Sequence, residues 1–220
     1  AFIYVTVLLD MLAFGIIIPV LPHLIEQLAG GGIAKAAWRV GIFSTVFAIV
    51  QFVFSPVQGA LSDRYGRRPV ILISNLGLAV DFVVLALAPT LWLLFVARIL
   101  LGMTAASFST ANAYIADIIP KEKRAAAFGI LGSAFGLGFI IGPGLGGFLG
   151  GIALRLPFWV AAALALCNFL YGFFILPESL PKERRTSRLE LHSAHPFGSL
   201  KLLRRYPQVL GLAVVLFLVY

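Results

Sequence analysis

Residues 69–88 read PVILISNLGLAVDFVVLALA, and Asp81 is the only charged side chain among them. An α-helix rises about 1.5 Å per residue, so about 20 apolar residues cross the ~30 Å hydrocarbon core of a bilayer. A transmembrane strand would alternate polar and apolar residues, and this stretch does not. It is therefore predicted to be a transmembrane helix.

Five further stretches share this character, and the composition of the chain agrees with them. Of 220 residues, 60% are hydrophobic and 12% are charged, and the mean hydropathy is +1.00. A soluble domain has about 45–50% apolar and about 25% charged residues, so this chain has too few polar side chains to cover a globule in water. An all-α integral membrane protein is predicted, with spans at residues 2–25, 40–61, 69–88, 91–115, 125–150 and 157–176.

The basic residues indicate how these helices are oriented. If the first helix runs outward, segments 62–68, 119–124 and 177–206 lie inside, and they hold 13 of the 17 lysine and arginine residues. Such a bias marks the cytoplasmic side of a membrane protein, so both ends of the six-helix block are predicted to be cytoplasmic. The net charge of +8 then reflects topology. Nucleic-acid binding, which needs a basic face on a water-exposed fold, is excluded.

The chain divides into three parts. Residues 1–177 are expected to form the six-helix bundle, residues 178–206 a polar cytoplasmic linker, and residues 207–220 the start of a seventh helix. The apolar run from Val209 to Tyr220 is too short to cross a bilayer. A long connection after six helices is typical of transporters built from two halves, so the chain is expected to be a piece of a longer protein.

Three charged side chains lie inside predicted spans: Asp10, Asp81 and Arg98. Each costs at least ~2.5–3.5 kcal/mol on insertion scales, so such residues usually have a function. Asp81 and Arg98 each lie seven residues from the helix ends that the turn at Pro89-Thr90 joins, which is about 10 Å along a helix. They are predicted to interact, through a shared cavity or as a static ion pair.

Asp10 lies deeper, about 20 Å from the outer end of its helix, and the sequence offers it no partner at its own level. Loss of water favours the neutral form of a carboxyl group, so Asp10 is predicted to take up and release protons. A carboxylate held by backbone donors is the alternative.

A second group of charges closes the second predicted helix, where residues 59–68 read GALSDRYGRR. Gly66 allows a tight reversal of the chain. Asp63 and the arginines then lie at the inner membrane face, level with Asp117, so a salt bridge from Arg67 or Arg68 to Asp117 is predicted. This bridge either latches one conformation and breaks in another, or braces the loop.

The fifth predicted helix carries a glycine every four residues, at Gly138, Gly142, Gly146 and Gly150, with Pro143 among them. Small residues at this spacing allow another helix to approach closely, and a proline inside a helix favours a bend. This ridge is predicted to pack against another helix, at a static or a moving interface.

Other candidate sites are few. Neutral polar side chains within spans are predicted to face a central cavity or to join helices; they are Gln51, Asn75, Asn112 and Asn168. His192 and His195 form a pair in the linker without a cysteine nearby, and no metal site is expected. The chain contains no GxxxxGK phosphate loop and no nucleophile constellation, so neither ATP hydrolysis nor another enzymatic activity is expected.

These motifs resemble those of the major facilitator superfamily. Residues 59–68 resemble its loop signature between helices two and three, and Arg98 with Gly102 resembles its helix-four motif. Gly138-x-x-x-Gly142-Pro143-x-x-Gly146-Gly147 resembles the helix-five motif of its drug/proton antiporters. Further segments are similar to bacterial tetracycline efflux proteins: Leu9-Asp10, Gly15, Pro19-Val20-Leu21-Pro22, Ala113-Tyr114-Ile115-Ala116-Asp117 and Leu176-Pro177-Glu178-Ser179.

The resemblance implies a six-helix amino-terminal bundle of a twelve-helix fold, with the chain ending inside helix seven. It implies an inner-membrane exporter that exchanges a small molecule for protons without a cofactor, and that works together with a carboxyl-terminal half. In that family, residues matching Asp10, Asp81 and Arg98 are implicated in transport. Gln51 and Asn112 join this group here as polar side chains within spans.

The residues matching Asp63 and Arg67 support gating in that family. The remaining members of the predicted gating loop are Gly59, Arg64, Gly66, Arg68 and Asp117, and Gly147 completes the helix-five motif.

Tetracycline-like drugs are the leading substrate expectation. An exporter of sugars or other small metabolites would use the same machinery and is an open alternative. A non-transporting membrane sensor or scaffold is another, although a scaffold would gain stability by losing its buried charges.

Overall fold

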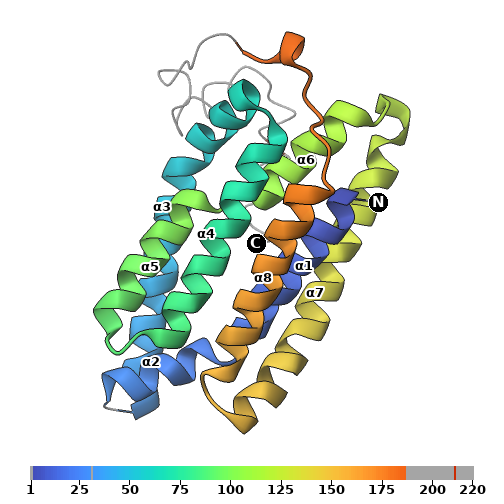
Figure 1. Cartoon of the computed structure of the whole chain (residues 1–220). Coiled ribbons are helices and arrows are strands. Elements are labelled where there is room, and N and C mark those ends of the chain that lie inside the picture. The colour runs from blue at the N-terminus through green and yellow to red at the C-terminus, as the bar shows by residue number, and fades with distance from the viewer. Residues whose placement is uncertain (1, 31, 187–210, 212–220) are drawn as a thin grey trace.

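The computed structural model describes residues 2–30, 32–186 and 211, and every regular element within them is helical. Six segments are long and apolar enough to cross a membrane, which confirms the six predicted spans. Four of them are each formed mainly by one helix (Figure 1): α3 (Gly32–Tyr65), α4 (Arg67–Leu87), α7 (Arg124–Ile152) and α8 (Leu156–Phe174). The predicted linker beyond residue 186 and the predicted seventh helix lie outside the described residues, residue 211 excepted.

The other two spans are broken, whereas each was expected to be one helix. The first consists of α1 (Phe2–Ile17) and α2 (Leu21–Ala29), and the interruption at residues 18–20 contains Pro19. The fourth consists of α5 (Leu91–Thr104) and α6 (Ser107–Ile118). Proline lacks the N–H that a continuous helix needs, which accounts for the first break.

The break between α5 and α6 is stabilised by neighbouring helices. The backbone N–H of Ala106 donates to Ser74 Oγ of α4 at 3.2 Å, and Gln51 Nε2 of α3 donates to the carbonyl of Ala105 at 3.3 Å. Irregular backbone is tolerated at membrane depth only where such partners satisfy it. Gln51 and Ser74 therefore make this interruption possible.

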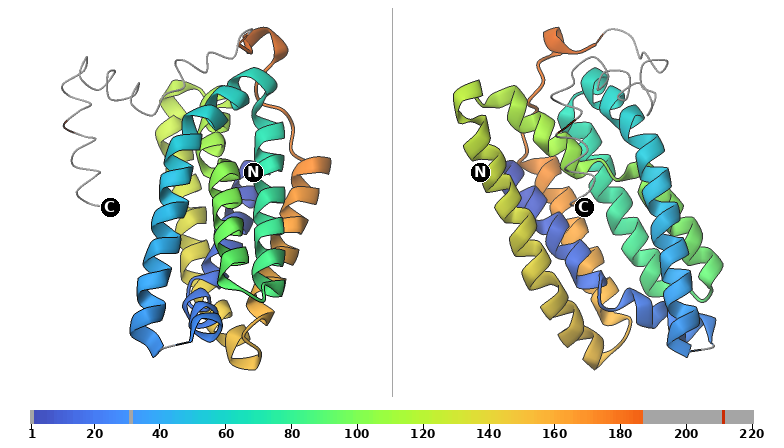
Figure 2. Two further views of the ribbon diagram at one scale, coloured as in Figure 1. Left: turned by 90° about the vertical axis from the view of Figure 1, so that its left-hand side faces the viewer. Right: turned by 180° about the vertical axis from the view of Figure 1, so that it is seen from behind.

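The spans pack into one bundle, in which α4 joins the helices of the two sides. On one side α1 lies against α7 and α8, and on the other α3 lies against α5, while α4 packs between α8 and α5 (Figures 1 and 2). The short η1 (Lys121–Lys123) precedes α7, and η2 (Lys182–Arg184) follows α8. Many large apolar side chains on the outside are exposed, among them Ile140, Phe148 and Phe174, as is typical of surfaces that face lipid or another helical bundle.

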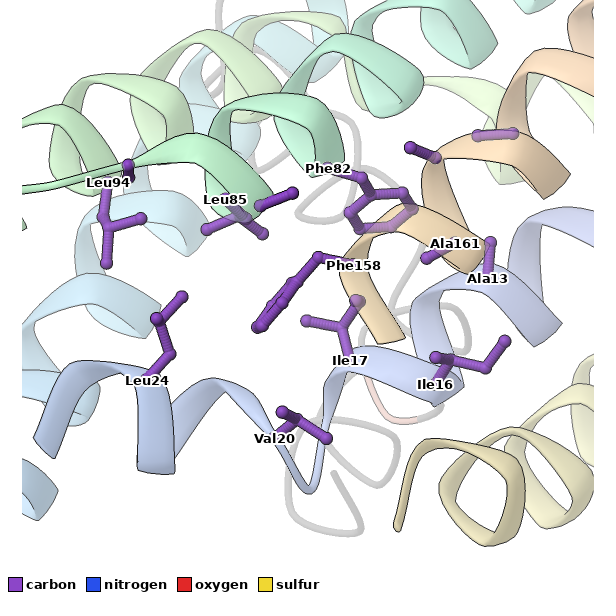
Figure 3. Packing of buried hydrophobic residues seen from close by; sticks show 14 of the residues in the cluster. Ala13, Ile16, Ile17, Val20, Leu24, Phe82, Leu85, Leu94, Phe158 and Ala161 are labelled. Atoms are coloured by element: carbon purple, nitrogen blue, oxygen red, sulfur yellow. The ribbon is translucent and has the colours of Figure 1, made fainter. Parts of the chain in front are cut away.

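Two buried apolar clusters hold the bundle together. One lies toward the turn between α4 and α5, where Phe82, Phe158 and Ile17 approach one another in Figure 3. The other contains Val7, Ile71 and neighbours from α6 and α7. Along α1, α4 and α8 the residues between these clusters include Asp10, Asn75 and Asn168, which are buried. A polar layer thus separates two apolar cores.

The predicted inner loops gather at one end of the bundle. The turn at residues 65–67 and the segments 119–123 and 175–186 lie there (Figure 1). We call this end the basic end, because it carries Arg64, Arg67, Arg68, Lys121, Lys123 and Arg124. That it faces the cytoplasm stays a prediction.

Candidate functional site

A cavity of ≈ 320 Å³ opens beside the polar layer. One wall is a continuous row of four phenylalanine rings from α1, α6 and α7. Phe135 stacks on Phe139 with ring centroids 4.7 Å apart, Phe108 meets Phe135 edge-on at 5.8 Å, and Phe14 is 6.4 Å from Phe139. Leu78 and Leu101 add further apolar surface. Such a cavity suits a flat, largely apolar molecule.

Few polar side chains line the cavity: Asp10, Gln51, Ser74 and Ser107. Asp10 is the only one of the cavity's lining residues that can carry a charge. Asp10 and Gln51, two of the five predicted proton-coupling and substrate residues, are therefore brought to one site, whereas the aromatic wall was not predicted.

Asp10 is 3% exposed and is held by neutral partners. Asn168 Nδ2 donates to Asp10 Oδ1 at 2.7 Å and also to the carbonyl of Thr6 at 2.8 Å. Asn75, with its amide nitrogen facing Asp10, donates to Asp10 Oδ2 at 3.1 Å. None of the ion pairs formed by the described residues involves Asp10. The expectation that Asp10 has no partner at its level is therefore wrong, although no charged partner was found.

Asp81 and Arg98 form the predicted ion pair, in which Arg98 Nη2 donates to Asp81 Oδ2. Both are buried between α4 and α5, and neither lines the cavity. The structure therefore shows the ion pair, and places it apart from the cavity beside Asp10. Asp81 Oδ1 and Arg98 Nε are buried and make no hydrogen bond within the described part of the chain. This pair is thus incompletely satisfied, and a buried ion pair needs such satisfaction to offset its desolvation.

At the basic end, Arg67 binds two carboxylates. Its Nε donates to Asp117 Oδ2 at 2.9 Å, and its Nη1 contacts Asp63 Oδ1 at 2.5 Å and Ser62 Oγ at 3.0 Å. The predicted salt bridge to Asp117 is confirmed for Arg67. Arg68 instead donates to the carbonyl of Phe173 at the end of α8. The gating role of this group stays a prediction.

Glu178 completes this group and was missed as a site residue. Its carboxylate accepts the backbone N–H groups of Arg67 at 2.8 Å and Arg68 at 3.3 Å, at the beginning of α4. Carboxylates are favoured at helix N-termini because the first N–H groups lack partners there. Gly66 has a φ of 106°, and a Cβ at Gly66 would lie 2.7 Å from Glu178 Cδ. The predicted tight reversal is confirmed, and Glu178 gives Gly66 a second reason to lack a side chain.

The chain after Glu178 continues across the basic end. Ser179 Oγ lies 3.2 Å from Asp117 Oδ2, and the backbone N–H of Thr186 donates to the carbonyl of Asp63 at 3.1 Å. Residues 178–186 therefore contact the ends of α3 and α6, even though they belong to the predicted linker.

The glycine ridge of α7 packs against α1. A Cβ at Gly142 would lie 2.6 Å from Gly15 Cα, and a Cβ at Gly138 would lie 2.6 Å from Met11 Cβ. Gly146 meets the backbone of Ile16 in the same way. Pro143 lies inside α7, which continues past it. The predicted close approach is confirmed, and α1 is the helix that approaches.

Other predicted residues lie apart from these contacts. Asn112 donates to the carbonyl of Phe108 in its own helix at 2.9 Å and does not line this cavity, so the structure does not bring it to Asp10. Its role in transport stays a prediction. Gly59 and Gly147 have open space beside them, since a methyl group at either would meet no atom within 4 Å. Neither Gly59 nor Gly147 is therefore needed for packing within the described residues. Arg64 lies over the ring of Tyr65.

The described residues contain no group of three or more His, Cys, Asp and Glu side chains able to hold a metal ion. His192 and His195 lie outside the described residues.

Comparison with known proteins gives one consistent result. Residues 3–220 match the family model of the Major Facilitator Superfamily. The chain is 41% identical over 213 residues to "Tetracycline resistance protein, class C" of Escherichia coli, covering 97% of this chain and 53% of that protein. It is 37% identical to "Multidrug resistance protein 2" of Bacillus subtilis, covering 79% of this chain and 42% of that protein.

Among solved structures, the human organic anion transporter MFSD10 (TETRAN) is similar, with a TM-score of 0.76 and 30% identity. The match covers 88% of this chain and 51% of that protein. The chain thus spans about half the length of the relatives it matches.

Proposed function

The chain belongs to the major facilitator superfamily, and from this premise we propose that it forms the amino-terminal half of a secondary active exporter. A proton gradient drives export, and no cofactor takes part. The leading substrates are tetracycline-like drugs. The protein lies in the cytoplasmic membrane with its basic end inside.

One observation carries this proposal: a buried carboxyl group, Asp10, at the wall of an apolar cavity, with no cationic partner among residues 2–30 and 32–186. A fixed counter-charge would hold a carboxylate ionised throughout a transport cycle. The partners of Asp10 within the described part of the chain are all neutral, so its charge can change when a proton binds. Since substrate and proton meet at one place, the binding of one can be exchanged for that of the other.

The cavity's shape and chemistry support the substrate class. A tetracycline is a flat molecule of four fused rings, and Phe14, Phe108, Phe135 and Phe139 offer a row of ring faces and edges. Aromatic pairs contribute about 0.5–1.5 kcal/mol each beyond their buried area. Relatives whose names refer to tetracycline and multidrug resistance support the same class.

The other charged groups have distinct roles in this proposal. The pair of Asp81 and Arg98 holds α4 and α5 together below the turn that joins them. The Arg67 bridges to Asp63 and Asp117 close the basic end in one conformation and open in another, as alternating access requires.

The test is drug/proton exchange by the full-length protein in proteoliposomes. We expect Asp10→Asn to abolish drug-coupled proton flux, because an amide cannot bind a proton near neutral pH, while membrane insertion stays normal. Cys167→Ser is the control, since Cys167 is an exposed residue next to Asn168 in α8. Unchanged exchange in Asp10→Asn would disprove the proposal.

A panel that includes tetracycline, a planar cationic dye and a neutral sugar decides the substrate class. Export of the sugar alone would favour the metabolite exporter. Absence of any proton-coupled flux in the wild-type protein would favour a non-transporting role.

A further inference from the structure

A second hollow opens on a different face of the bundle from the cavity beside Asp10. It is a groove of ≈ 390 Å³ between α4 and α8, which lie side by side (Figure 1). On α4, Ser74 and Leu78 line the cavity, whereas Leu76 and Val80 line the groove. A helix turns about 200° over two residues, so the groove and the cavity lie on opposite sides of α4. α8 contributes no residue to the cavity.

The groove is apolar throughout, since each of its nine lining residues is an alanine, valine, leucine or tryptophan. Ala79 and Ala162 are buried and form its floor. Val80 of α4 and Trp159 of α8 are 51% and 45% exposed and form its two sides. Both helices are long and apolar enough to cross a membrane. The groove therefore lies at membrane depth, where an alkyl chain is the ligand that suits it.

A cation lies at one mouth of the groove, at the end of the bundle opposite the basic end. Arg155 donates to the carbonyls of Ala86 and Ala88 at the end of α4. Along the chain it is one helical turn from Trp159, and Ala88 is one turn from Val84, which also lines the groove. One turn is about 5.4 Å. Arg155 is therefore close to the end of the groove on both helices.

The charge of Arg155 is not matched by a carboxylate. None of the ion pairs formed by the described residues includes Arg155, and the side chain is only half-buried. A guanidinium group has five N–H donors, so the two bonds to carbonyls leave others for a further acceptor. Arg155 is also the N-cap of α8, which has no side-chain cap. A helix N-terminus favours an anion, and arginine binds phosphate well.

The apolar groove alone would not select a ligand. Lipid tails surround the whole bundle, so an alkyl chain in the groove gains only the van der Waals contacts of a closer fit. A phosphate at Arg155 adds a charge-assisted interaction that holds the molecule in one place. A phospholipid has both parts in this order, because its phosphate lies at the membrane surface and its chains lie below. Trp159 agrees with this level, since tryptophan is enriched at the membrane interface.

We propose that the groove between α4 and α8 binds one phospholipid, with the phosphate at Arg155 and one acyl chain between Val80 and Ala163. The lipid belongs to the leaflet opposite the basic end. It contacts α4 and α8 together and so stabilises their packing. The site shares no residue with the cavity beside Asp10, and it does not depend on the proposed transport function.

The first experiment compares two ligands on the unchanged full-length protein. The protein in detergent is titrated with phosphatidylglycerol, and in parallel with a diacylglycerol that has the same acyl chains, and bound lipid is counted by native mass spectrometry. We expect the Kd of the first phosphatidylglycerol to be lower by about tenfold or more, the worth of one hydrogen bond between charged groups. Equal Kd values for the two lipids overturn the proposal.

The second experiment fills the groove without changing Arg155. Ala163 lines the groove and is exposed, so a larger side chain there does not disturb the core. We expect Ala163→Phe to remove the tight binding of phosphatidylglycerol. The control is Cys167→Phe, because Cys167 is exposed one turn further along α8 and does not line the groove. It should keep the wild-type Kd. Unchanged binding in Ala163→Phe overturns the proposal, because the lipid then lies elsewhere, for example at the basic end.

The same measurements identify the other possible occupants of the groove. If a second copy of the chain covers it, Ala163→Phe converts a dimer into a monomer in the mass spectrum and leaves phosphatidylglycerol binding unchanged. If the carboxyl-terminal half covers it, Ala163→Phe lowers the stability of the full-length protein and again leaves lipid binding unchanged. Either result overturns the phospholipid site.

Discussion

The contact between α1 and α7 makes a sharp prediction about Gly142. A methyl group at Gly142 would lie 2.6 Å from Gly15 Cα and 2.8 Å from the carbonyl carbon of Gly15. Carbon atoms prefer separations of about 3.5–4.0 Å, so Gly142→Ala forces the two helices apart by about 1 Å. Backbone cannot rotate away as a flexible side chain does. We therefore expect a loss of about 1–3 kcal/mol in the free energy of unfolding, as for other overpacked interfaces.

Gly144 is the matched control on the same helix. Nothing lies within 4 Å of a methyl group at Gly144, and alanine favours a helix over glycine by about 0.5–1 kcal/mol. Gly144→Ala should leave stability unchanged or raise it slightly. The measurement is unfolding of the full-length protein from mixed micelles by SDS, followed by far-UV circular dichroism. Equal midpoints for the two variants would refute the close approach of α1 and α7.

The contacts of charged residues and one turn give three further predictions. Asp81→Asn and Arg98→Gln should each lower the free energy of unfolding by about 3–5 kcal/mol, because each variant leaves one buried charge without its partner. In a double-mutant cycle, the double variant should lose less free energy of unfolding than the two single variants lose together. Gly66→Ala should lower the SDS midpoint, because Gly66 has a positive φ and a methyl group there would collide with Glu178. Gly59→Ala is the control and should not lower the midpoint, since Gly59 has open space around it. Equal midpoints for the two variants would contradict this prediction. Arg155 donates to the carbonyls of Ala86 and Ala88 at 2.7 and 3.0 Å. Arg155→Met should therefore lower the free energy of unfolding by about 1.5–3 kcal/mol in the same assay. An unchanged midpoint would contradict this, and would show that water replaces the guanidinium group.

Local sequence information was sufficient for the spans and for contacts across short turns. Apolar length determined the six spans, and the brief connection at Pro89-Thr90 brought Asp81 and Arg98 together. Arg67 and Asp117 were predicted to meet because both lie at inner helix ends. In each case distance along the chain or depth in the membrane restricts the possible partners to a few residues.

Contacts between distant helices were not predictable in this way. Asn168 and Asp10 are separated by 158 residues, and nothing in the sequence determines how α8 is rotated about its axis relative to α1. The aromatic wall was missed for the same reason, since Phe135 and Phe139 could equally have faced lipid. Asn112 lies apart from Asp10, because a polar residue in a span can also bond within its own helix. Glu178 was missed for the same reason, because it binds the beginning of α4 from a position 111 residues further along the chain.

At Ala105 and Ala106 the fourth span is divided into two short helices, α5 and α6. In one continuous helix, a change in tilt at one membrane face would also change the tilt at the other face. Here the joint is stabilised by Gln51 and Ser74, which belong to other helices, so the direction of α5 does not determine the direction of α6. Under the proposed function, a substrate that contacts Ser107 is then expected to displace the 12-residue α6 and not the whole span. The last turn of α6 contains Asp117, which binds Arg67 at the basic end, so a movement of α6 is expected to reach that salt bridge.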